Sequence, residues 1–135
     1  MSMSVTTTAG STFLRRVLLL DAVVTAGNGL IYLAASGLVG RLLDVPAGLL
    51  VGLGIFMLLY GGGVGYLGTR PVPSNGWVEV VIAGNAAWVA ASFAVLLFGW
   101  LEPSTVGTVW IPMQAAVVAG FAVLQALGLR WRERG

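Results

Sequence analysis

The chain has 135 residues, of which 58% are hydrophobic and only 9% are charged. Soluble domains carry about 25% charged residues, so a soluble fold of this composition would lack the charge to cover its surface. The sequence contains no histidine, cysteine or lysine, which excludes disulfides, imidazole or thiolate metal sites, Schiff bases and histidine-based catalytic triads. A net charge of only +2 gives no reason to expect nucleic acid as a partner.

The first twelve residues, MSMSVTTTAGST, are mostly polar and lack hydrophobic periodicity. We therefore predict a disordered N-terminal segment over 1–12, followed by a single transmembrane domain over 13–135. The paired arginines and the leucine run that follow also fit the start of a signal peptide. The length of that run and the aspartate inside it argue against cleavage.

Four apolar runs are long enough to cross a bilayer, which takes roughly 20 residues. In chain order, the predicted spans are 17–40, 47–67, 78–98 and 106–129. The segments between them are rich in Gly, Pro, Ser and Asn, which is typical of turns. The predicted fold class is therefore all-α: a polytopic membrane protein with four transmembrane helices.

The basic residues are distributed unevenly about these spans. One side of the predicted layout carries only Arg41. The other side carries the remaining arginines, which are Arg15, Arg16, Arg70, Arg130, Arg132 and Arg134. Because cytoplasmic segments carry the excess of basic residues, both termini and the 68–76 loop are predicted to face the cytoplasm.

Two stretches of the chain are similar to each other. VVTAGNGLIYLA at 23–34 and VVIAGNAAWVAA at 80–91 match at six of twelve positions. The same offset of 57 residues pairs Pro46 with Pro103, each at the start of a predicted span. We therefore predict a tandem, parallel repeat of two helical hairpins, with Asn28 and Asn85 at equivalent positions.

Polar residues gather on one helical face in three of the spans. On the first span these residues are Asp21, Thr25, Asn28 and Tyr32. On the third span Asn85 aligns with Trp88 and Ser92, and on the fourth Gln114 aligns with Gln125. The amides are expected to hydrogen-bond between helices, where such bonds average about 0.6 kcal/mol.

Asp21 is the acid expected within the hydrocarbon. A rise of 1.5 Å per residue puts it about 6 Å inside the first span and Asn28 about 16 Å inside. Two interpretations remain open for Asp21: a shallow ion pair with an arginine such as Arg16, Arg70 or Arg130, or a site that binds a proton or cation and opens inward. Glu79 is expected at the interface, exposed to solvent.

The second span carries two pairs of glycines four residues apart, Gly48 with Gly52 and Gly61 with Gly65. Such spacing lets helices approach closely in lipid. We expect this helix to pack tightly on two sides, and we favour packing within the four-helix bundle over a dimer interface.

AGNAAWVAAS, followed by QAAVVAGFAVLQALGLRW, resembles the small four-span integral membrane proteins of bacteria. In size and helix count the chain also resembles DoxX-like proteins. The resemblance implies a multi-pass protein of the bacterial inner (cytoplasmic) membrane. It implies no catalytic or binding residues.

For function, we expect an accessory, scaffold or interaction protein of that membrane, not an enzyme, with no cofactor and no metal. Only carboxylates remain for acid–base chemistry, and no second carboxylate lies at the depth of Asp21. The expected partners are the lipid bilayer and either a membrane protein or a second copy of the chain.

Two alternatives remain open. The first is a small transporter or channel whose polar path passes Asp21 and Asn28. The second is a membrane binder of an apolar ligand such as a lipid or quinone, with Phe56, Tyr60 and Trp88 lining a cleft between helices.

Overall fold

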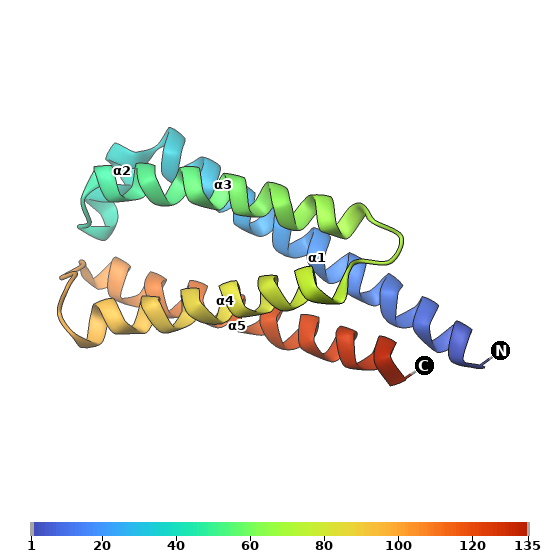
Figure 1. The fold of residues 1–135 in the computed structure, drawn as a ribbon. Coiled ribbons are helices and arrows are strands. Elements are labelled where there is room, and N and C mark those ends of the chain that lie inside the picture. Colours follow the sequence, from blue (N-terminus) through green and yellow to red (C-terminus); the bar gives the residue numbers. More distant parts are fainter. Residues whose placement is uncertain (1, 135) are drawn as a thin grey trace.

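The computed structural model describes the backbone of residues 2–134 and the side chains of residues 9–132. Within this part, the chain folds into five helices joined by short loops (Figure 1). They are α1 (Ser2–Ala34), α2 (Ser36–Leu43), α3 (Ala47–Thr69), α4 (Asn75–Leu97) and α5 (Thr105–Arg134).

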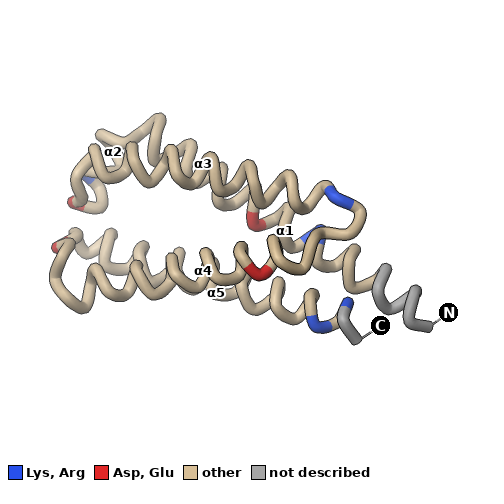
Figure 2. The backbone as a smooth tube through the Cα atoms, viewed as in Figure 1, with Lys and Arg blue, Asp and Glu red and all other residues tan. Residues whose placement is uncertain are grey.

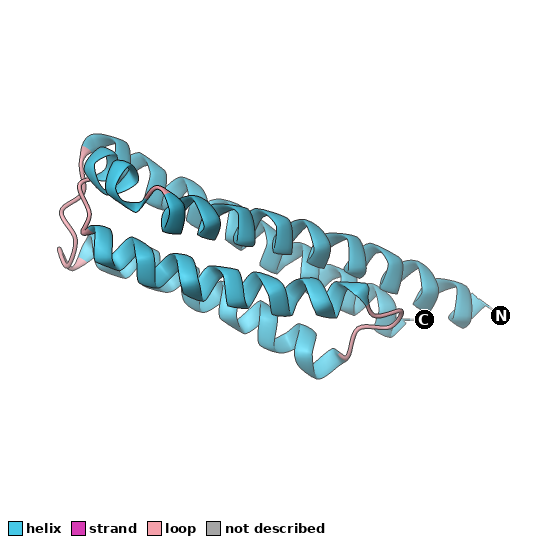
Figure 3. Cartoon of the chain, turned by 90° about the horizontal axis from the view of Figure 1, so that it is seen from above, coloured by secondary structure: helices cyan, strands magenta, loops and turns pink. Residues whose placement is uncertain are grey.

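Four of the helices are long and apolar enough to cross a membrane, as the sequence predicts. The corresponding segments are Ala9–Ala34, Ala47–Thr69, Asn75–Leu97 and Thr105–Arg132. Their long axes run side by side, with the loops at the two ends of the bundle (Figure 3). The chain is therefore a multi-pass membrane protein by length and composition.

The structure differs from the sequence prediction at the start of α1. We predicted disorder over 1–12, but the helix begins at Ser2. The reason is a close contact with α5: a Cβ atom placed on Gly10 would lie 2.7 Å from the backbone nitrogen of Arg132. Ser11 is also buried, so the last turns of this segment gain a packing partner that the sequence does not reveal.

The first span also ends earlier than predicted. Helix α1 ends at Ala34, whereas the apolar run predicts a span as far as residue 40. The residues that follow form the separate short helix α2, which ends at Leu43 and is followed by Asp44 in the left-handed conformation (φ 56°). The break falls at Ala35, whose backbone is not helical (φ −120°, ψ 31°).

Helices α1 and α3 pack closely through glycines. A Cβ on Gly54 would lie 2.7 Å from the carbonyl oxygen of Gly29, and a Cβ on Gly61 would lie 3.0 Å from Ala26. The predicted packing on two sides of α3 is only partly observed. Among the described residues, no atom lies within 4 Å of a Cβ placed on Gly48 or Gly52.

The α1–α3 pair and the α4–α5 pair meet at both ends of the bundle. At the end that holds the termini, α1 packs on α5 around Leu14, Leu18 and Leu129. At the other end, the backbone nitrogen of Ser104 donates to the carbonyl oxygen of Leu43 (2.8 Å). Helices α3 and α4 make few contacts with each other, which leaves space between the pairs in the middle of the bundle.

The α1–α3 contact predicts a difference between two glycines of one helix. Gly54→Ala should lower the free energy of unfolding in detergent by about 1–3 kcal/mol, because the new methyl group overlaps the α1 backbone. Gly52→Ala should leave it unchanged or raise it slightly. Thermal unfolding followed by circular dichroism measures both, and equal melting temperatures would contradict the described packing.

Candidate functional site

Asp21 lies deep in the bundle. On α1 it lies five residues, about 7.5 Å along the helix axis, beyond Arg16. The side chain is only 1% exposed. A carboxylate costs about 2.5–3.5 kcal/mol at the centre of a membrane helix, so a buried acid such as Asp21 needs neighbouring groups that solvate it.

Three neutral side chains donate hydrogen bonds to the Asp21 carboxylate. The hydroxyl of Thr25 donates to Oδ1 at 2.9 Å. The amides of Asn85 and Gln125 donate to Oδ2, at 2.9 Å and 2.7 Å respectively. In each contact a carboxyl oxygen of Asp21 is the acceptor.

Asn85 links this carboxylate to α3. Its amide nitrogen also donates to Gln125 Oε1 at 3.1 Å. Its amide oxygen lies 3.2 Å from the hydroxyl oxygen of Tyr60. The same hydroxyl lies 2.9 Å from the carbonyl oxygen of Val81. These contacts join five side chains, and all four long helices contribute at least one of them. We call this group the Asp21 cluster: Asp21, Thr25, Tyr60, Asn85 and Gln125.

The ion pair considered for Asp21 is not observed among the described residues. Arg16, Arg70 and Arg130 are all exposed, and the guanidinium of Arg70 lies over the Tyr66 ring at 5.6 Å. The reason is geometric: these arginines are exposed toward the end of the bundle that holds the termini (Figure 2), whereas Asp21 is buried between the helices.

Buried apolar side chains fill the bundle between the Asp21 cluster and that end. They form one packed group: Leu14, Leu18, Ala22, Val64, Leu67, Val78, Val81 and Leu129. We call this group the apolar plug. It separates the deep carboxylate from the arginine-rich end of the protein.

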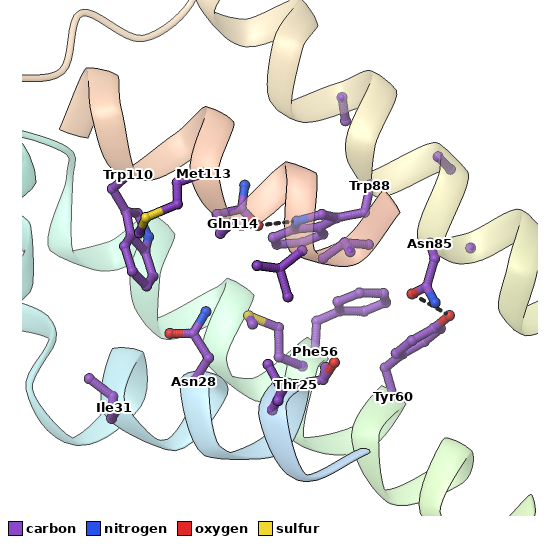
Figure 4. A pocket seen from close by; sticks show the side chains of 17 residues that line it. Thr25, Asn28, Ile31, Phe56, Tyr60, Asn85, Trp88, Trp110, Met113 and Gln114 are labelled. Atoms are coloured by element: carbon purple, nitrogen blue, oxygen red, sulfur yellow. Dashed lines mark hydrogen bonds between the residues drawn. The ribbon is translucent and has the colours of Figure 1, made fainter. Parts of the chain in front are cut away.

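On the other side of the Asp21 cluster lies a cavity of about 650 Å³, here called the central cavity. All four long helices contribute to its wall, which is mostly apolar. Figure 4 shows Phe56 and Tyr60 of α3 on one side and Trp88, Trp110 and Met113 of α4 and α5 on the other. The rings of Phe56 and Tyr60 stack with their centroids 5.7 Å apart.

Most polar groups at the cavity wall already have partners. The indole nitrogen of Trp88 donates to Gln114 Oε1 at 2.6 Å, and that of Trp110 donates to the Tyr32 hydroxyl at 2.7 Å. The amide nitrogen of Gln114 donates to the Ser92 hydroxyl at 3.1 Å. Asn28 differs: it lines the cavity, and no hydrogen bond joins its side chain to another residue in the described part of the chain.

The central cavity opens toward the surroundings of the bundle. Several side chains of its wall are about half exposed, including Ile31 on α1 (56%), Phe56 on α3 (52%) and Met113 on α5 (50%). A smaller cavity of about 170 Å³ adjoins it and shares Trp88 and Trp110. In a bilayer, these openings face lipid.

The structure thus separates the residues that the sequence grouped together. Asp21, Thr25, Asn85 and Gln125 meet in one cluster. Asn28 lines the cavity instead, Tyr32 bonds to Trp110, and Glu79 is exposed on α4.

Two contributors did not emerge from the sequence: Tyr60 as a hydrogen-bond partner of Asn85, and Trp110 as a wall residue. The position of Trp110 one turn before Gln114, on the same helical face, was the available signal.

Comparison with protein-family models, curated proteins and solved structures gives no match for this chain.

The two asparagines of the repeated Ala-Gly-Asn motif should respond differently to one substitution. Asn85→Leu removes two donated hydrogen bonds, one of them to a carboxylate, and should lower the free energy of unfolding by about 1–3 kcal/mol. Asn28→Leu should have little effect, because its amide has no such bond in the described chain. Unfolding by SDS titration in mixed micelles measures both. Equal losses would contradict the different roles assigned to Asn28 and Asn85, and an unchanged stability of Asn85→Leu would show that its hydrogen bonds do not stabilise the fold.

Proposed function

We propose that this protein binds an apolar, lipid-soluble ligand in the central cavity, within the membrane. The observation that carries the proposal is the cavity itself, about 650 Å³ in the middle of a small bundle. Small-molecule sites have volumes of roughly 300–1,000 Å³ and walls that are mainly apolar and aromatic, with a few polar groups. A helix bundle whose only role was structural would gain stability by closing such a space.

The wall chemistry supports an apolar ligand with a polar group at one end. Phe56, Trp88 and Trp110 offer aromatic surface, and Met57 and Met113 offer adaptable apolar contacts. The Asn28 amide would hydrogen-bond the polar group of the ligand. The half-exposed wall residues support access from the lipid rather than from water.

This proposal ranks ligand binding ahead of the two other functions that the sequence left open. A scaffold or accessory role has one supporting feature, the unoccupied glycine face of α3 at Gly48 and Gly52. A transport path has less support, because the apolar plug fills the bundle between Asp21 and the arginine-rich end. The wall residues support binding rather than catalysis.

We also propose that the protein lies in the bacterial inner membrane with both termini in the cytoplasm. The positive-inside rule supports this orientation, because arginines gather at the end of the bundle where the termini and the 70–74 loop lie (Figure 2). We propose further that the α1–α3 and α4–α5 pairs arose by tandem duplication, which the repeated motif around Asn28 and Asn85 supports.

The orientation can be tested with single cysteines, since the chain has none of its own. In intact spheroplasts, an impermeant maleimide should label Ser104→Cys but not Ser74→Cys. Inverted vesicles should give the opposite pattern. Labelling of Ser74→Cys from outside would reverse the proposed topology.

The binding proposal can be tested by filling the cavity. Native mass spectrometry of gently purified protein should detect a co-purifying lipid-soluble molecule. Ala91→Phe should abolish this adduct, because Ala91 lines both cavities.

The matched control is Ala90→Phe, which places the same ring at the neighbouring exposed position, outside the cavity wall. Loss of the adduct in both variants, or in neither, would argue against the cavity as the binding site.

A further inference from the structure

We infer that the ligand of the central cavity is an apolar organic cation, attracted by the buried carboxylate of Asp21. This inference rests on the proposed function and names its ligand class. Three observations lead to it: the charge of the Asp21 cluster, its position against the cavity, and the aromatic wall.

The first observation is the charge. The partners of Asp21 are a hydroxyl and two amides, so they solvate the carboxylate without neutralising it. The arginines of the described chain are engaged elsewhere or exposed: Arg15 donates to the carbonyl oxygen of Gly68 at 3.3 Å, and Arg132 donates to Asn75. In its ionised form, Asp21 therefore gives the interior of the bundle one negative charge. Its field is strong because the surroundings have a low dielectric constant.

The second observation is the position of that charge. Thr25 and Asn85 each bond directly to the carboxylate, and both also line the central cavity. One layer of side chains therefore separates Asp21 from a bound ligand. The apolar plug lies on the other side of Asp21. A cation can therefore approach the carboxylate from the central cavity.

The third observation is the wall. Aromatic rings attract cations through the negative potential of their faces, and four such rings line the cavity: Phe56, Tyr60, Trp88 and Trp110. A small hydrated cation would lose its water in this apolar space at high cost. An organic cation with a delocalised or shielded charge avoids that cost and fills the cavity with apolar contacts.

The test uses two probes of the same shape and opposite charge, tetraphenylphosphonium and tetraphenylborate. Binding to the purified full-length protein in detergent is measured by equilibrium dialysis. For each probe, the specific signal is the part that Ala91→Phe abolishes. We expect specific binding of the cation to be at least tenfold tighter than that of the anion. If the two probes bound with equal specific affinity, the inference would be wrong. This comparison needs no substitution of Asp21.

Two acid-to-amide variants test the source of the selectivity. Asp21→Asn should weaken tetraphenylphosphonium binding at least tenfold, whereas Glu79→Gln, at an exposed position on α4, should not change it. If Asp21→Asn retained the affinity of the unmodified protein, the inference would be wrong. If this variant failed to fold, the comparison of the two probes would still decide the question.

A neutral probe separates this inference from the proposed function. N-phenyl-1-naphthylamine should bind to the unmodified protein, and Ala91→Phe should abolish its binding. If this neutral probe binds and the cation shows no preference, the cavity binds ligands but not by charge. If no probe gives an Ala91-dependent signal, both proposals fail.

Discussion

The central constraint on this fold is that hydrocarbon offers no hydrogen bonds to a buried carboxylate. Asp21 must obtain them from the protein, and it obtains them from a threonine on its own helix and from amides on α4 and α5. This requirement fixes the rotation of three helices relative to one another. A purely apolar bundle of four helices would have many packings of similar energy, and the cluster selects one of them.

The rest of the bundle is organised around that point. Toward the termini, the helices converge and pack as an apolar plug. Toward α2, the two helix pairs diverge, and they meet again where Trp110 bonds to Tyr32 and where Ser104 contacts Leu43. The glycines that bring α1 and α3 together keep that pair closely packed, and the space opens between the two pairs.

Much of this architecture follows from the sequence, because span length and helical periodicity are local properties. Hydropathy identifies the four spans, and a period of 3.6 places Asp21 and Thr25 on one face. Which faces meet is a tertiary property. Asn28 and Asn85 occupy the same motif, yet only Asn85 lies level with Asp21 and Gln125. The early start of α1 likewise depends on a contact of Gly10 with α5, which local sequence cannot reveal.

The distribution of the Asp21 cluster over all four long helices has a consequence for biosynthesis. Membrane helices are inserted in chain order, and Gln125 lies on the last of them. Until that helix arrives, the carboxylate lacks its shortest hydrogen bond, and α1 has not yet gained its contacts with α5. A ribosome that stopped after α4 would therefore release an incomplete bundle with an under-solvated acid in the lipid. Membrane quality-control proteases can recognise such a product. The last helix therefore supplies the hydrogen bond and the packing that complete the fold.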